Sequence, residues 1–175
     1  MADFEWPWQY NFPPFFTIQP NRETRTKQLE AWKELIVRYY RVHKKYIMDL
    51  TEAQSSPLFN NKDIERSLSI DEIYIILDSL QKQGNLEWLD KQKQRCFIYW
   101  RTPEEWAKLI YNWIDSRGMK GTVCTLYELT NGDDVVNEEF YELDEELLVK
   151  ALQLLQYKGR AELINFGDSQ GVKFF

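Results

Sequence analysis

One structural unit occurs twice in this sequence, and the repeat restricts the possible folds more than any other feature does. At a constant offset of 75 residues (68 to 143, for example), several residues of the first copy meet identical residues of the second. The matching pairs are Leu68 with Leu143, Leu77 with Leu152, Leu80 with Leu155, Gln81 with Gln156, Gly84 with Gly159 and Glu87 with Glu162. Repetition of this kind predicts two copies of one small domain.

The first copy predicts the element order of a winged-helix domain, which is helix, short strand, helix, helix and two-stranded hairpin. Apolar residues recur at helical spacing, Ser69 with Glu72 forms a capping box, and Gly84 suits the end of a helix. A polar turn joins two apolar runs at the end of the copy, as in a hairpin. The predicted elements are a helix over 23–46, a strand over 47–50, a brief helix capped by Thr51, a helix between 69 and 84, and strands over 85–89 and 96–100.

The second copy predicts the same order. Thr102, Pro103 and two acids form a strong helix start, because an N-cap, an N1 proline and first-turn carboxylates all favour it. Arg117 and Gly118 end that helix, and Asp144 opens the last one. The remaining predicted elements are a strand over 122–125, a short helix near Tyr127, and hairpin strands over 161–166 and 172–175 with a tip over 167–171.

The fold class is therefore α+β, with two winged-helix domains in tandem. Residues 1–102 hold a proline-aromatic N-terminal motif and the first winged helix, and residues 103–175 form the second. Thr102 is almost the only residue between the copies. Since so short a linker permits little rotation, we expect a rigid, elongated arrangement.

A nucleic-acid-binding winged-helix protein is the alternative function to weigh. The helix before the hairpin is the one that enters a DNA groove in such proteins. Here that helix begins with Asp71 and Glu72 in one copy and with three acids over 144–146 in the other, and the net charge is -6. Acids oppose phosphate binding. Only the turn over 91–95 is basic, so we do not expect nucleic acid as a partner.

No residue cluster predicts catalysis, a metal or a cofactor. His43 is the only histidine and lies among cations, while Cys96 and Cys124 fall in different copies and not at metal-ligand spacing. There is no glycine-rich phosphate loop. We expect a non-enzymatic chain. Two cysteines without a disulfide framework, and no signal segment or membrane-length apolar run, favour a cytoplasmic location.

The segment WPWQYNFPPFF, residues 6–16, predicts a binding function. Six of its residues are aromatic, three are proline and none is charged. Prolines favour an extended, polyproline-like strip, and such strips dock into grooves of partner proteins. Its own first domain and a partner protein are both open as the cover for these rings. In a mixed arrangement, residues 6–10 pack inward and residues 13–16 face outward.

Several motifs together resemble the family of vacuolar protein-sorting 25 subunits of the ESCRT-II endosomal sorting complex. They are FEWPWQYNFPPFF, SPLFNN, GNLEWLD, RTPEEWAKLIYNW, TLYELTNGDD and GVKFF, and they span residues 4–175. The resemblance implies two winged helices in tandem, in agreement with the repeat. It also implies a Y-shaped complex in which two copies of this subunit join one copy each of two larger winged-helix subunits. The presence of two copies leaves self-association of the subunit open.

The same resemblance implies that the N-terminal motif docks onto the larger subunits and so faces outward. The corresponding residues here are Trp6, Pro7, Trp8, Tyr10, Pro13, Pro14, Phe15 and Phe16. Some relatives carry a PPXY-like form of this motif. Since this chain has phenylalanine at the last position, we do not expect it to bind WW domains.

The resemblance further implies that the second winged helix binds the N-terminal helix of an ESCRT-III subunit. A surface short of charge beside the acidic stretch 132–146 suits a basic amphipathic helix. We expect this surface to contain Thr125, Leu126, Tyr127, Lys173 and Phe174. The alternative is that Leu126, Phe174 and Phe175 belong to the core. The expected function is a non-catalytic scaffold in multivesicular-body sorting of ubiquitinated cargo, recruited peripherally to endosomal membranes and contacting them only indirectly.

Overall fold

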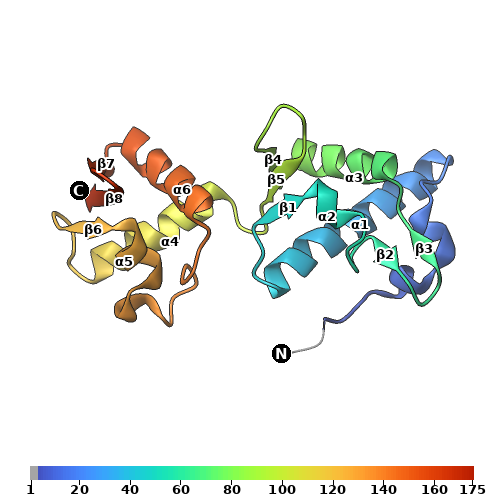
Figure 1. Cartoon of the computed structure of the whole chain (residues 1–175), viewed down its shortest axis with the longest axis horizontal. Coiled ribbons are helices and arrows are strands. Elements are labelled where there is room, and N and C mark those ends of the chain that lie inside the picture. Colours follow the sequence, from blue (N-terminus) through green and yellow to red (C-terminus); the bar gives the residue numbers. More distant parts are fainter. Residues whose placement is uncertain (1–3) are drawn as a thin grey trace. The chain divides into compact units, whose positions relative to one another are not determined.

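Residues 4–175 are described by the computed structural model, and they divide into two compact units at Trp100 and Arg101 (Figure 1). Each unit has a three-stranded antiparallel sheet and a set of helices in the winged-helix order. The tandem winged-helix prediction is confirmed. The rigidity of the connection between the units stays a prediction.

The first unit begins with two 3-10 helical turns and then follows the predicted order. Its sheet has the strand order β1-β5-β4, and a small separate hairpin pairs β2 with β3. The elements are η1 (Trp8–Asn11), η2 (Pro13–Phe16), α1 (Arg22–Val42), β1 (Ile47–Asp49), α2 (Leu50–Ala53), β2 (Asn60–Asn61), β3 (Arg66–Ser67), α3 (Ile70–Gln83), β4 (Leu86–Trp88) and β5 (Arg95–Ile98).

Three details of the first unit differ from the prediction. Helix α1 ends four residues early, because Lys44 adopts a left-handed conformation with φ of 50° and Lys45 N–H donates back to the carbonyl of Tyr40 at 2.8 Å. Helix α2 is capped by Asp49, whose carboxylate accepts from Thr51 N–H, so Thr51 is not the cap. The β2–β3 hairpin is an addition, since strands of two residues carry no readable periodicity.

The second unit repeats the design with its own sheet, of strand order β6-β8-β7. Its hairpin tip is a two-residue turn at Gly167 and Asp168, shorter than predicted, because Phe166 pairs with Ser169 and Gly167 tolerates a φ of 69°. The elements are α4 (Pro103–Ser116), β6 (Val123–Thr125), α5 (Leu126–Asn131), η3 (Asp133–Val135), α6 (Glu145–Tyr157), β7 (Ala161–Phe166) and β8 (Ser169–Phe174).

Side chains cap the helices where the sequence indicates it. Ser69 with Glu72 and Thr102 with Glu105 form complete capping boxes, in which each side chain accepts a hydrogen bond from the backbone N–H of the other residue. Gly84 follows α3 with φ of 93°, a conformation that costs other residues about 1 kcal/mol or more. The acids at these helix starts therefore satisfy backbone N–H groups, and this is a structural reason for their presence.

Each unit is built around a tryptophan on its first helix. Trp32 of α1 and Trp106 of α4 are both fully buried, and α1 packs on α3 as α4 packs on α6. In the first unit the core also takes in rings from the N-terminal segment. No helix within residues 4–175 is both long and apolar enough to cross a membrane.

Candidate functional site

The N-terminal segment, residues 4–19 and hereafter the strap, is not the extended polyproline strip that the sequence predicts. It forms two 3-10 turns, closed by hydrogen bonds such as Phe12 N–H to Gln9 carbonyl at 2.9 Å and Phe15 N–H to Phe12 carbonyl at 2.9 Å. A proline φ near -65° fits the first positions of a 3-10 turn as well as a polyproline helix. Tertiary contacts select between the two.

Phe15 and Phe16 of the strap face inward, so the outward placement of these two residues is wrong. Phe15 stacks on Trp32 with ring centroids 4.2 Å apart and planes 3° from parallel. Phe16 meets the same indole edge-on at 5.4 Å. Both side chains are buried. Their aromatic area completes the core beside α1, and this burial outweighs any outward docking by these two rings.

Backbone carbonyls of the strap are held by Gln28, a buried polar residue of α1. Its Nε2 donates to Phe15 O at 3.0 Å and to Thr17 O at 2.8 Å, while its Oε1 accepts from Gln19 N–H at 3.0 Å. Trp32 Nε1 also donates to Phe15 O, at 2.9 Å. Because buried amides need such partners, this clamp fixes both the path and the register of η2.

Tyr10 fixes the first turn of the strap. Its ring stacks on Trp6 at 3.8 Å, its hydroxyl donates to Pro57 O, and its carbonyl accepts from Asn61 Nδ2 at 2.7 Å. Burial, with smaller effects from Tyr39 and Asp63, raises the pKa of Tyr10 to about 12. The phenol therefore stays neutral at physiological pH and serves as an anchor.

The strap leaves one aromatic pair at the surface. Trp8 is 70% exposed and Phe12 is 48% exposed, and their ring centroids lie 5.6 Å apart. The prediction that residues 6–10 pack inward is therefore wrong for Trp8. Pro13 and Pro14 are exposed. Trp8 and Phe12 border a groove of about 240 Å³ beside α1, together with Pro14. We call Trp8, Phe12, Pro13 and Pro14 the strap face.

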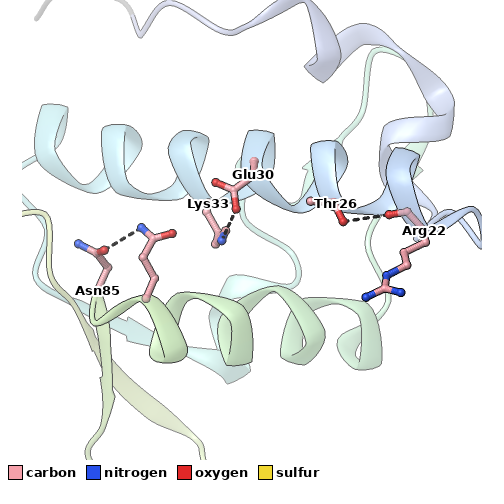
Figure 2. A network of polar contacts seen from close by, with 6 residues as sticks. Arg22, Thr26, Glu30, Lys33 and Asn85 are labelled. Carbon is pink, nitrogen blue, oxygen red and sulfur yellow. Dashed lines mark hydrogen bonds and ion pairs between the residues drawn. The ribbon is translucent and has the colours of Figure 1, made fainter.

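Four polar side chains near the contact between α1 and α3 form two pairs. Lys33 is buried, and its ammonium lies 2.6 Å from the carboxylate of Glu30 (Figure 2). Gln83 and Asn85, at the end of α3, share a hydrogen bond of 2.8 Å. These residues line a groove of about 460 Å³ that also reaches Pro7 of the strap. Because Lys33 already has an ion-pair partner, this groove offers no free cation at that residue.

The second predicted surface is divided between core and solvent. Leu126 and Phe174 are buried, so their assignment to a docking surface is wrong: they point into the second unit, as the alternative stated. Thr125 is half-buried and caps α5 through a capping box with Glu128. Tyr127 is 73% exposed and Lys173 is half-buried. Val123, the strand partner of Lys173, is also exposed, and we call Val123, Tyr127 and Lys173 the β6 face.

Groups that often serve in catalysis have structural partners here. His43 Nδ1 lies 2.8 Å from Tyr39 O, and its ring packs on the Tyr39 ring at 4.1 Å. Burial raises the pKa of the Cys96 thiol to about 12 and raises that of Cys124 as well, which makes thiolate chemistry unfavourable. Over residues 4–175, no three His, Cys, Asp or Glu side chains lie close enough to hold a metal ion.

The fold defines a tandem winged-helix protein, and its candidate binding surfaces are the strap face and the β6 face, each with an exposed aromatic ring. The family model described as "ESCRT-II complex subunit" matches residues 9–144. Similar full-length proteins include vacuolar protein-sorting-associated protein 25 of Danio rerio, 59% identical over 172 residues (98% of this chain, 99% of that one). The human protein is 56% identical with 98% of each chain covered, and that of Drosophila melanogaster 44% with both chains fully covered.

Solved structures agree with this similarity. Subunit VPS25 of the endosomal trafficking complex ESCRT-II superimposes with a TM-score of 0.85 at 33% identity, covering 95% of this chain and 98% of that one. A chain of the ESCRT-II complex VPS22/VPS25/VPS36 gives 0.83 at 34% identity, covering 96% and 98%. The chain therefore belongs to the family of ESCRT-II complex subunits, which act in endosomal trafficking. The resemblance seen in the motifs is confirmed.

Two important residues of the strap region carry weak sequence signals. Phe12 is outward because it precedes Pro13, which keeps its backbone extended at φ of -101° and ψ of 108° and turns the ring away from η2. Gln28 lies one helical turn before Trp32, on the apolar side of α1. A lone glutamine on an apolar face indicates a buried hydrogen-bonding role, and this signal is readable in retrospect.

The buried and exposed rings of the strap predict unequal effects of substitution on stability. Phe15→Ala removes the stack on Trp32 and is expected to lower the free energy of unfolding by about 3–5 kcal/mol. Phe12→Ala, the matched control on the same strap, is expected to change it by no more than about 0.5 kcal/mol. Urea unfolding monitored by circular dichroism measures both. Equal effects of the two substitutions contradict this division of the strap.

The raised pKa of Tyr10 predicts a loss of stability in alkali. The folded state holds the proton more tightly, so the stabilisation is complete below pH 10 and is lost as the pH rises towards 12. In Tyr10→Phe the fall should be shallower, by up to about 1.4 kcal/mol per pH unit. Burial also raises the pKa of Tyr40, so the slope is reduced and not abolished. Tyr157→Phe, at a ring 92% exposed, should leave the slope of the wild type unchanged.

Proposed function

We propose that the chain is a non-catalytic scaffold subunit that attaches to the two larger subunits of ESCRT-II through the strap face. The observation that carries the proposal is the exposure of Trp8 and Phe12 on a backbone that the core holds in place. A similar solved structure contains VPS22, VPS25 and VPS36 together, which supports larger ESCRT-II subunits as the partners.

A fixed strap suits this role energetically. Covering a large apolar ring contributes about 1.5–3 kcal/mol, and exposed tryptophans are frequent centres of binding energy. Ordering a flexible segment on binding subtracts from such gains, and the clamp by Gln28 removes that cost because the strap is already folded. The two exposed prolines add rigidity beside the ring pair.

The residues predicted for this site then fall into two roles. Trp8, Pro13 and Pro14 contact the larger subunits, joined by Phe12, while Trp6 and Pro7 border the face at its half-buried edge. Tyr10, Phe15 and Phe16 act from within the core by holding the strap in position. Their substitution affects docking through folding and not through direct contact.

The second proposed contact joins the β6 face to the N-terminal helix of an ESCRT-III subunit. Tyr127 offers an exposed aromatic ring at the start of α5, and Val123 adds apolar surface beside Lys173. Acids of the stretch 132–146 follow α5 directly, so a helix with one apolar and one basic side finds complementary groups. Leu126 and Phe174 support this face from the core.

These contacts lead to a mechanism based on local concentration. Two copies in one complex hold two ESCRT-III molecules close together, which raises their effective concentration for polymerisation. The complex acts in this way during multivesicular-body sorting of ubiquitinated cargo. The chain itself is cytoplasmic and reaches endosomal membranes peripherally, through its partners.

The strap face is tested by co-expression of the chain with the two larger subunits. The wild type is expected to assemble in two copies, by native mass spectrometry, whereas W8A/F12A is expected to fold normally and stay unassembled. Exposed aromatics of the second unit provide the matched control, so Y157A/F166A should assemble as the wild type does. A folded W8A/F12A chain that assembles in full refutes the assignment of the anchor.

The β6 face is tested with a labelled peptide of an ESCRT-III N-terminal helix and fluorescence anisotropy. The variant V123S/Y127A removes exposed apolar surface from this face and is expected to weaken binding about tenfold or more, which corresponds to about 1.4 kcal/mol. Tyr157→Ala removes an even more exposed ring from α6 and should leave the Kd unchanged. The assignment fails when the two variants bind the peptide equally well.

A further inference from the structure

Charge is unevenly distributed over the second unit. Residues 101–175 hold fourteen Asp and Glu against eight Lys and Arg, whereas residues 1–100 hold fourteen of each. The stretch 132–146 contributes eight of these acids and no cation. Several cations of the unit are matched, since Arg101 pairs with Glu139 and Lys120 with Asp115 at 3.2 Å. Cations of this unit that have no such partner are therefore candidates for a binding site.

Three of them surround a groove between α4 and the C-terminal end of α6. The groove has a volume of about 350 Å³, and Lys108, Lys158 and Arg160 line it together with Tyr111. All three cations are exposed, and none makes an ion pair among the described residues 4–175. Buried Ala107 and Leu155 also line it and give it an apolar floor.

Tyr111 is held rigidly within this groove. Its hydroxyl donates to Phe175 O at 2.6 Å. Two cations also contact its ring: the Arg160 guanidinium lies 5.3 Å and the Lys120 ammonium 5.1 Å from the ring centroid. Cation–π contacts of this kind orient a side chain without neutralising its charge. Arg160 is thus positioned at the groove and keeps its capacity for a bidentate carboxylate contact.

Two acids from the first turn of α4 also line the groove. Glu105 accepts from the backbone and hydroxyl of Thr102 in a capping box, so its charge is directed at the start of α4. Glu104 is exposed in the same first turn. An acidic ligand is therefore attracted by Lys158 and Arg160 and repelled by Glu104.

We propose that this groove, hereafter the α4–α6 groove, binds an acidic peptide segment of a partner protein, with carboxylates on Lys108, Lys158 and Arg160 and an apolar side chain on the floor. The lining combines three cations with apolar side chains, so a peptide that carries both acidic and apolar residues fits it better than a compact anion does. The site is separate from the strap face and the β6 face, and it does not depend on the proposed scaffold function.

The experiment uses the full chain and two fluorescein-labelled peptides, EDELFDEEL and its neutral match QNQLFNQQL. The acidic peptide is expected to bind at least about tenfold more tightly than the neutral one. The variant K158E/R160E should lose at least about tenfold in affinity. K62E/K91E, which changes the net charge equally on exposed lysines of the first unit, should bind as the wild type does. Raising the salt concentration should weaken binding, because these cations are exposed.

Four results overturn the proposal. The first is that K158E/R160E and the wild type bind the acidic peptide equally well, and the second is that the neutral peptide binds as tightly as the acidic one. The third is that Lys158 and Arg160 retain the chain on phosphatidylserine vesicles while no peptide binds. The fourth is self-association that K158E/R160E abolishes and that the peptide does not displace. The last two assign the groove to a membrane or to a second copy. Single variants Lys108→Ala and Lys158→Ala, each expected to weaken binding by a smaller factor, keep the test valid if the double variant does not fold.

Discussion

The contact between Trp32 and the strap is the interaction on which the rest of the first unit depends. The indole stacks on Phe15, meets Phe16 edge-on and donates its N–H to the Phe15 carbonyl, so one side chain supplies apolar area and a hydrogen bond at once. Because the hydrogen bond satisfies a carbonyl within the core, the strap can be buried without a desolvation penalty at that point. The exposure of Trp8 and Phe12 follows from this seating of the turns around them.

The two copies of the repeat protect equivalent tryptophans in different ways. Trp106 of α4 is as deeply buried as Trp32, but in the second unit the apolar side chains beside the first helix come from the connection between α5 and α6 and not from a strap. Val135 and Phe140 of that connection are buried, Phe140 meets Trp113 edge-on at 5.7 Å, and Arg101 lies over the Trp106 ring. One architecture thus tolerates different covers, as long as apolar area is supplied above the first helix.

Sequence patterns predicted those elements whose signals are local. The capping boxes at Ser69 and Thr102 and the left-handed Gly84 depend on residues close in the chain, and the repeat and family motifs extend these signals over the whole fold. The orientation of the strap was not predictable in this way. Its prolines and rings are compatible with either face, and the choice rests on Gln28 and Asn61, which are distant in sequence and have no periodic signature. The wrong placement of Leu126 and Phe174 has the same cause, since the sequence does not distinguish an apolar residue of the core from one of an interface.

Glu72 connects the strap to α3 of the first unit. One of its oxygens completes the capping box at Ser69, and the other accepts from the Ile18 N–H at 2.7 Å. The start of α3 and the end of the strap are therefore secured by a single carboxylate, and neither is complete without the other. A chain whose first unit is unfolded cannot display the strap face in its seated form. Under the proposed attachment through that face, assembly selects natively folded copies and so serves as a check on folding.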